Sequence, residues 1–149
     1  MKKEKVKELT EKYLTFEKEN GIGYAENRED RVKDTGEVFT PLELVFEMLD
    51  ELDYDWDTLP DKTFLDPTCG NGQFLVGIAI RGVHPKNIYG VDLMEDNVKI
   101  TKHRLRDIYK EHGYSEDEIQ KYLNKNIVQA DALEYDFSFG ENESILEEW

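Results

Sequence analysis

A run of acidic, polar and small residues at positions 66–74 holds the side chains and turns that could bind a small ligand. It reads DPTCGNGQF and follows a short apolar segment, 63–65, that suits a buried strand. Gly70 and Gly72 allow the positive φ angles and the close ligand approach that a side chain would block. Apolar residues then recur at helical spacing, at positions 74, 75, 78 and 79. The run therefore predicts a strand, a turn and a helix start that present backbone N–H groups and a carboxylate to a ligand.

The charge of this run discriminates between the ligands that such a loop could bind. A nicotinamide dinucleotide is disfavoured, because its G-x-G-x-x-G fingerprint needs a third glycine and position 75 is Leu. Asp66 would repel a pyrophosphate but would attract a positively charged, amino-acid-like ligand. S-adenosylmethionine (SAM), which carries an ammonium and a sulfonium group, meets this requirement. The alternative is a purely structural strand, turn and helix without a ligand.

The same run resembles the cofactor-binding loop of the N6-adenine DNA methyltransferases of restriction-modification systems, which use SAM. The resemblance implies cofactor contacts for six residues: Asp66, Thr68, Cys69, Gly70, Gly72 and Phe74. With the segments described next, it extends over about residues 36–139. It implies the α/β architecture of that family, here an incomplete Rossmann-like SAM-dependent methyltransferase fold with a parallel sheet and flanking helices.

A second segment with the family's pattern is 36–41, which reads GEVFTP. It resembles the part of these methyltransferases that precedes the glycine loop and closes over the methionine end of the cofactor, which implies contacts from Phe39, Thr40 and Pro41. The residues by themselves predict a capping box, with Thr40 as N-cap, Pro41 as the first helical residue and Glu43 as the third. Phe39 is then a hydrophobic staple residue. The capping and cofactor roles can coexist.

A predicted second strand, 87–92, ends in Asp92, 20 residues beyond Gly72. This spacing suits an acid that accepts both ribose hydroxyls of a nucleotide. The segment GVDLM resembles the second cofactor motif of the methyltransferases, which implies that Asp92 binds the ribose and that Leu93 or Met94 lies against the adenine ring. The alternative for Asp92 is an N-cap of the following helix.

A predicted third strand, 126–130, is followed directly by Asp131 at its carboxyl end. The segment ADAL resembles the third cofactor motif of the family, in which the acid accepts the exocyclic amine of the cofactor's adenine and the next backbone N–H meets a ring nitrogen. The resemblance thus implies roles for Asp131 and Ala132. By itself, an Asp at the end of a strand is a turn former more often than a ligand.

Hydrophobic periodicity places these strands at 63–65, 88–91 and 127–130 of a parallel sheet, with helices between them. In the helix predicted over 95–112, four apolar residues face inward and four basic ones face outward: Val98, Leu105, Ile108 and Tyr109 against Lys102, Arg104, Arg106 and Lys110. Ser115 opens a short helix to Tyr122 through a second capping box.

The chain divides into three predicted parts. Residues 1–35 comprise an extra N-terminal helix over 2–19 and a basic loop, residues 36–139 the SAM-binding domain, and residues 140–149 an acidic tail. The helix is nearly neutral and is expected to pack or to contact a partner, so the better candidates for phosphate contact are the basic loop residues Arg28, Arg31 and Lys33.

The composition limits the partners. A formal net charge of −15 over 149 residues disfavours unaided binding to duplex DNA. One cysteine excludes an internal disulfide, and no apolar run approaches the length of a membrane span, so the expectation is a cytoplasmic protein without a membrane partner. The histidines at 84, 103 and 112 lack metal-binding spacing, and no metal site is predicted.

No catalytic residues are predicted, because the family's Asn or Asp followed by Pro-Pro and an aromatic residue is absent from these 149 residues. Three interpretations remain open. The chain is the SAM-binding half of an adenine methyltransferase that needs a second chain for catalysis, a non-catalytic SAM-binding or decoy protein, or a degenerate family member. An unpaired sheet edge after the third strand favours a second chain or self-association.

Overall fold

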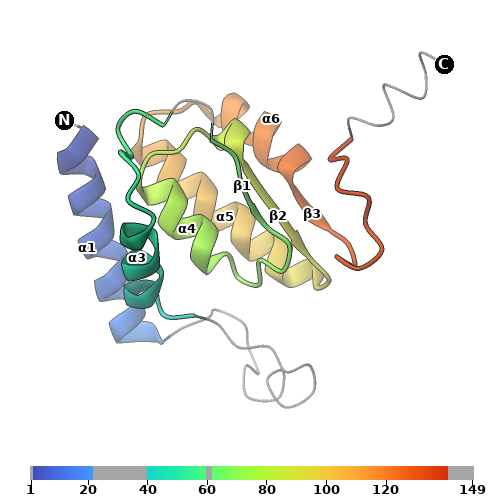
Figure 1. Cartoon of the computed structure of the whole chain (residues 1–149), viewed down its shortest axis with the longest axis horizontal. Helices are drawn as coiled ribbons and strands as arrows, with labels where there is room; N and C mark the ends of the chain where they lie inside the picture. The colour runs from blue at the N-terminus through green and yellow to red at the C-terminus, as the bar shows by residue number, and fades with distance from the viewer. Residues whose placement is uncertain (1, 22–39, 60–61, 141–149) are drawn as a thin grey trace.

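The computed structural model describes residues 2–21, 40–59 and 62–140, and these contain a three-stranded parallel sheet in the order β1-β2-β3 (Figure 1). The strands are β1 (Phe64–Asp66), β2 (Ile88–Asp92) and β3 (Ile127–Gln129). Phe64 is the register partner of Ile88, and Gly90 that of Ile127. The predicted α/β class, the parallel pairing and the three strand positions are confirmed, with boundaries within one residue of those predicted.

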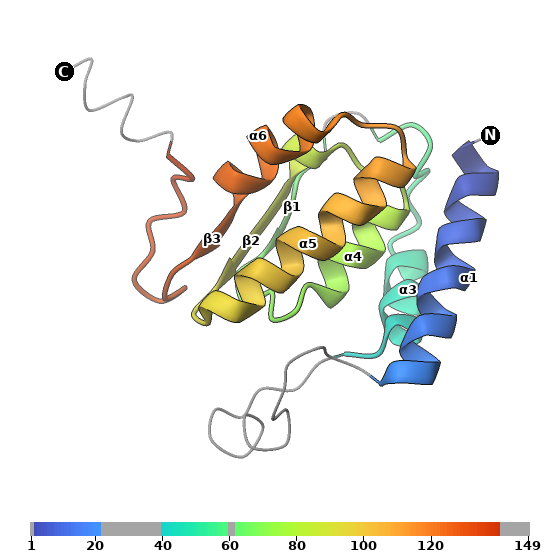
Figure 2. The same ribbon diagram turned by 180° about the vertical axis from the view of Figure 1, so that it is seen from behind.

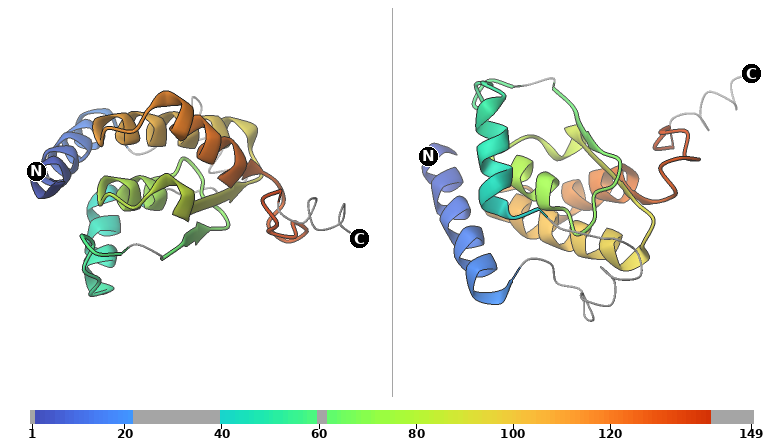
Figure 3. Two further views of the ribbon diagram at one scale, coloured as in Figure 1. Left: turned by 90° about the horizontal axis from the view of Figure 1, so that it is seen from above. Right: turned by 60° about the horizontal axis from the view of Figure 1, so that its bottom comes forward.

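Three helices of the described residues pack on this sheet, and two more pack against one of them at one end of the molecule. The helical elements are α1 (Lys2–Asn20), α3 (Leu42–Glu51), α4 (Gln73–Ile80), the 3-10 turn η1 (Pro85–Asn87), α5 (Glu95–Glu111) and α6 (Glu116–Asn126). Figure 2 shows α4, α5 and α6 in front of the strands, and Figure 3 shows α1 and α3 together at one end of the molecule, with the segment after β3 at the other. None of the helices in the described ranges is long and apolar enough to cross a membrane.

A single hydrophobic core joins the helices to the sheet. Its completely buried members come from α1, α3, α4, β2, α5 and β3 and include Leu9, Leu42, Val45, Leu75, Ile80, Ile88, Leu105, Ile108 and Ile127. Gly90 permits a close approach within this core, because a Cβ there would lie 2.7 Å from Leu75 Cδ1. Since Leu9 of α1 belongs to this core, the N-terminal helix is an integral layer of the fold. The division of the chain into 1–35, 36–139 and 140–149 stays a prediction.

The second face of the sheet is covered unevenly. Leu65 and Tyr89 are register partners and so share this face. The ring of Phe139, from the segment after β3, lies 4.8 Å from the ring of Tyr89. Leu65, by contrast, is 49% exposed, so β1 has an exposed apolar side chain and an edge that no other strand of the described residues pairs with.

Two predictions about helix ends and faces are wrong. Thr40 does not cap α3, because Pro41 is the N-cap, lies outside the helix and provides no capping hydrogen bond. The N–H of Leu42 is instead capped from α1, by Glu17 Oε2 at 2.9 Å. Arg104 does not face outward: it is 6% exposed, because backbone and amide oxygens of the glycine loop accept its hydrogen bonds.

The predicted N-cap of the second capping box is confirmed. Ser115 is the N-cap of α6, and its Oγ accepts a hydrogen bond from the N–H of Glu118 at 3.3 Å. The helix continues to Asn126, four residues beyond the predicted end at Tyr122. The inward face predicted for α5 is confirmed, since Val98, Leu105, Ile108 and Tyr109 are all buried.

Candidate functional site

The glycine loop, residues 67–72, connects β1 to α4 and bends over the end of β2. The Cys69 N–H donates to the Val91 carbonyl at 2.8 Å, which ties the loop to the sheet. Gly70 and Gly72 have φ angles of 55° and 90°, so the predicted need for positive φ is confirmed. The loop therefore brings its backbone to the carboxyl edge of the sheet, where β1 ends in Asp66 and β2 in Asp92.

Asp92 holds the loop and the following helix together. Its Oδ1 accepts the Gly70 N–H at 3.0 Å, and its Oδ2 accepts the Met94 N–H at 2.9 Å and Asn97 Nδ2 at 3.1 Å. The N-cap of α5 is Met94, so the alternative role of Asp92 as that N-cap is wrong. A carboxylate offers about four acceptor positions, and three are occupied. Asp92 can thus accept about one further hydrogen bond without losing an internal one.

Asp66 is a half-buried carboxylate beside another negative charge. Burial raises its pKa above the ordinary value, the charge of Asp92 raises it further, and the hydrogen bond from the Thr68 N–H opposes both. Among the described residues no basic side chain forms an ion pair with Asp66. A cation placed here would relieve both the burial penalty and the repulsion from Asp92. The site therefore favours a positively charged ligand group.

The cysteine of the glycine loop is an unreactive thiol at neutral pH. Cys69 is 5% exposed, and burial, together with the charges of Asp92 and Asp66, raises its pKa to about 12. Its Sγ lies 4.0 Å from Thr101 Oγ1. Because the thiolate is the nucleophilic form, Cys69 is a packing residue at neutral pH rather than a nucleophile.

Helix α5 supports the loop from below, through residues that the sequence analysis missed. Thr101 Oγ1 donates to the Gly70 carbonyl at 3.0 Å, and Arg104 Nη1 donates to the Asn71 carbonyl at 3.0 Å. A Cβ on Gly72 would lie 3.0 Å from the Thr101 side chain, so glycine is needed there for space as well as for φ. Helical spacing from Leu105 and Ile108 was the available signal, since it places positions 101 and 104 on the same buried face.

Two further buried residues, Asn71 of the loop and Gln73 at the start of α4, were also missed as site residues. Asn71 is 1% exposed, and neither its Oδ1 nor its Nδ2 has a hydrogen-bond partner in the structure. Buried amides are normally paired, so this amide has the capacity to bind a polar ligand group. Gln73 is 3% exposed and fully engaged, accepting from Arg104 and donating to Glu17 and to the Thr40 carbonyl.

The remaining predicted residues lie at different depths. Thr40 and Pro41 precede α3, and the Thr40 carbonyl is 2.6 Å from Gln73 Nε2, which joins this segment to the loop. Phe39 lies outside the described residues. Leu93 is 63% exposed and Met94 is half-buried at the start of α5. Phe74 lines a cavity of about 350 Å³ with Asp66 and the side chains of α3 and β1.

The third predicted acid, Asp131, is more exposed than Asp66 and Asp92. Asp131 is exposed, and its Oδ1 accepts the N–H of Leu133 at 3.0 Å. Pairing with β2 continues as far as Ala130, whose N–H donates to the Asp92 carbonyl, so Asp131 and Ala132 lie just past the same edge. The structure thus brings together Asp66, the glycine loop and Asp92, and places Asp131 in an exposed turn just past the same edge.

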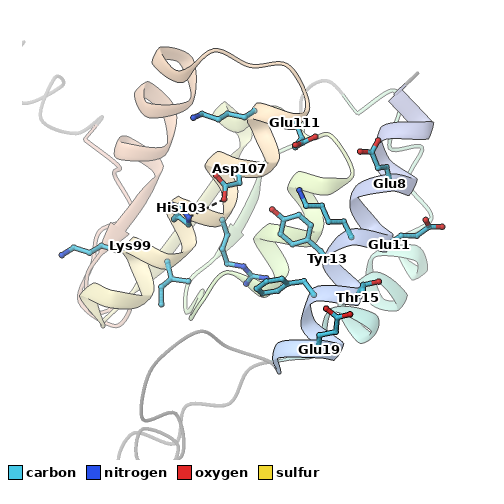
Figure 4. Close-up of a pocket in the computed structure, with 14 residues that line it drawn as sticks. Glu8, Glu11, Tyr13, Thr15, Glu19, Lys99, His103, Asp107 and Glu111 are labelled. Carbon is cyan, nitrogen blue, oxygen red and sulfur yellow. Dashed lines mark ion pairs between the residues drawn. The ribbon is translucent and has the colours of Figure 1, made fainter.

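A larger cavity of about 1060 Å³ lies between α1 and α5, away from the glycine loop (Figure 4). Tyr13, Phe16 and Ile100 contribute apolar surface to it, and charged side chains such as Glu11 and Lys110 surround them. None of the residues that the sequence assigned to the cofactor lines it. The candidate site is therefore the carboxyl edge of the sheet.

Comparison with known proteins finds a matching family and similar methyltransferases. A family model described as N-6 DNA Methylase matches residues 23–142. The type II methyltransferase M.VspI of Vibrio sp. (strain 343) is 37% identical over 99 residues, which cover 66% of this chain and 23% of the relative. For the type II methyltransferase M.BstVI of Geobacillus stearothermophilus the identity is 30% over 115 residues, covering 66% of this chain and 20% of the relative. The chain thus spans between a fifth and a quarter of these relatives. No solved structure matches significantly.

Proposed function

The chain belongs to the N-6 DNA methylase family, and on that premise we propose that it is the SAM-binding portion of an adenine-specific DNA methyltransferase of the restriction-modification type. The observation that carries the proposal is the half-buried carboxylate of Asp66 next to Asp92, without a basic side chain paired to it among the described residues. The ammonium and sulfonium groups of SAM are cations of the kind that such a site favours.

Each site residue has a role in this proposal. Asp66 attracts the positively charged end of SAM, and the glycines let the cofactor approach the backbone. Asp92 accepts a ribose hydroxyl, while Leu93 and Met94 offer apolar surface to the adenine. Asp131 and Ala132 recognise the edge of the adenine ring. The bound cofactor supplies the methyl group for transfer.

The fit of the cofactor is supported by two further observations. The unpaired amide of Asn71 provides a donor and an acceptor beside the glycine loop. The remaining acceptor capacity of Asp92 suffices for one ribose hydroxyl, so a second hydroxyl has to replace an internal partner such as the Gly70 N–H.

In this proposal the three parallel strands are part of an incomplete Rossmann-like methyltransferase fold, and the protein works in the cytoplasm.

Catalysis requires groups that these 149 residues do not contain. A flipped adenine must be gripped by polar groups and stacked on an aromatic ring, and the Asn/Asp-Pro-Pro-aromatic segment that does so in the family is absent from the sequence. We therefore expect a second chain, or a segment outside these residues, to supply it and to provide the main contacts with DNA.

The free edge of β1 is the place that we propose for this partner. The sequence analysis placed the open edge after the third strand, but among the described strands β1 is an edge strand as well, and it has exposed apolar neighbours. Leu65, Met48 and Leu52 are between 43% and 49% exposed around it. An unpaired strand edge with apolar neighbours favours the addition of another strand.

Calorimetry with SAM, followed by a methyl-transfer assay on adenine-containing DNA, tests the proposal. The expected result is cofactor binding without methyl transfer by this chain alone. Addition of the part of a relative that this chain does not match is expected to restore transfer. Failure to bind SAM would contradict the proposal, and rapid methylation by the chain alone would show that other residues replace the missing segment.

A non-catalytic SAM-binding or decoy function is the second candidate, favoured by the absence of the base-gripping segment. It predicts that SAM binds but that no added fragment restores methyl transfer. The same pair of experiments therefore separates the two candidates.

A further inference from the structure

A hydrogen-bonded chain of three side chains links the N-terminal helix to the glycine loop. Its first member is Glu17 of α1. Glu17 Oε1 accepts Gln73 Nε2 at 2.7 Å, and Glu17 Oε2 accepts the N–H of Leu42 at 2.9 Å. The two oxygens of one carboxylate thus hold the starts of α4 and α3, which are 31 residues apart in sequence (73 minus 42).

The middle of this chain is the amide of Gln73, whose orientation is fixed by a charge on each side. Its Oε1 accepts Arg104 Nη1 at 2.8 Å, while its Nε2 faces the Glu17 carboxylate. A cation at the oxygen and an anion at the nitrogen polarise the amide in the same sense, which strengthens both hydrogen bonds. Because Gln73 and Arg104 are 3% and 6% exposed, water competes little for these bonds.

The middle and the far end of this hydrogen-bonded chain, Gln73 and Arg104, also contact the segment before α3 and the glycine loop. Gln73 Nε2 also donates to the Thr40 carbonyl at 2.6 Å, and Arg104 Nη1 also donates to the Asn71 carbonyl at 3.0 Å. Pro41 offers α3 no side-chain cap, so Glu17 satisfies a helix-terminal N–H that the local sequence leaves open.

We infer that Glu17 is a positioning residue for the cofactor site: through Gln73, its carboxylate fixes residues 40–42 against the glycine loop. This inference rests on the proposed function as far as SAM is concerned. It assigns to α1 a role in ligand binding, although no residue of α1 is among those expected to touch the ligand.

The test compares Glu17→Ala and Glu17→Gln with the matched control Glu19→Ala, a change at an exposed acid on the same helix. We expect SAM affinity to fall roughly tenfold in E17A, the equivalent of one lost charge-assisted hydrogen bond. E17Q should lie between, because its amide has one acceptor oxygen in place of two, and E19A should match the wild type.

Amide hydrogen exchange of the ligand-free protein gives an independent readout. Protection is expected to fall at Leu42, whose N–H loses its acceptor, and at residues 70–73 in E17A, and to stay unchanged in α6, which packs elsewhere. A uniform loss of protection would show a merely structural role and overturn the inference, as would unchanged SAM affinity in E17A. If E17A does not fold, the same two measurements on E17Q decide.

The two readouts also separate the inference from the proposed function. If the wild type itself does not bind SAM, the proposed function fails, and hydrogen exchange still decides whether Glu17 positions residues 40–42. If the wild type binds SAM and E17A binds it equally well, only the inference fails.

Discussion

The ends of β2 and β3 carry the same residue at the same edge of the sheet but in different settings. Asp92 is half-buried and accepts three hydrogen bonds, from the glycine loop and from both sides of the α5 start. Asp131 is exposed and accepts only within its own turn, where its carboxylate binds the Leu133 N–H and its carbonyl the N–H groups of Glu134 and Tyr135.

The difference arises from what surrounds each strand end. The glycine loop bends over the end of β2, and α5 starts within three residues and returns Asn97 to the carboxylate. After β3 the chain turns away, and its aromatic residues pack on one another and on Tyr89. A carboxylate at a strand end therefore becomes a preorganised site only where a neighbouring loop closes over it.

The largest expected effect is that of Asp92→Ala. The substitution leaves the Gly70 N–H and the Asn97 amide without their acceptor and removes the proposed ribose contact. We expect SAM affinity to fall by about 1.5–3 kcal/mol, the typical value for a hydrogen bond to a charged group, and the free energy of unfolding to fall by about 2–3 kcal/mol. Calorimetry and urea denaturation measure the two quantities.

Asp92→Asn is the matched control, since its Oδ1 can keep the Gly70 bond while its amide nitrogen faces the Met94 and Asn97 donors. It should lose less stability than the alanine variant. Unchanged SAM affinity in both variants would assign Asp92 to the architecture of the loop alone and would remove its difference from Asp131 in ligand binding.

Asp66→Asn is expected to have opposite effects on binding and stability. The pKa of Asp66 is raised in the folded protein, so the folded state holds this proton more tightly than the unfolded chain does, and its contribution to stability decreases as the pH rises above the ordinary value of 3.8. Asparagine removes that decrease and keeps an acceptor for the Thr68 N–H. At pH 7 the variant should be more stable, by less than about 1 kcal/mol, and should bind SAM more weakly by about 1.5–3 kcal/mol.

Thermal denaturation of the wild type and D66N between pH 4 and pH 7 checks the sign. The stability difference in favour of D66N should grow with pH. A difference that shrinks as the pH rises would show that the Asp66 carboxylate is stabilised in the ligand-free fold and would contradict its assignment as a site awaiting a cation.

The sequence was sufficient for the sheet and for the glycine loop, because both depend on local patterns. Apolar runs at 63–65 and 88–91 and the two loop glycines are visible in the residues themselves, and the strands and positive φ angles of the structure agree with them. The residues that support the loop could not be predicted from the sequence. Thr101 and Arg104 are more than 30 residues away from the loop along the chain, and only the packing of α5 brings them to it. The capping box failed at Thr40 for the same reason, as a carboxylate from α1 took its place.

Asp131→Ala is expected to have the smallest effect. It tests the comparison of Asp92 with Asp131 at the exposed acid. The exposed carboxylate is available to accept the exocyclic amine of adenine, but no neighbouring loop holds it in position. A neutral donor and a solvated acceptor make a modest bond, so SAM affinity should fall by about 0.5–1.5 kcal/mol, less than in D92A. A SAM analogue with hydrogen in place of the 6-amino group of its adenine should bind equally to both proteins if this contact exists. If D131A loses as much affinity as D92A, the exposed turn must close on the ligand, and the difference between the two strand ends disappears when SAM binds.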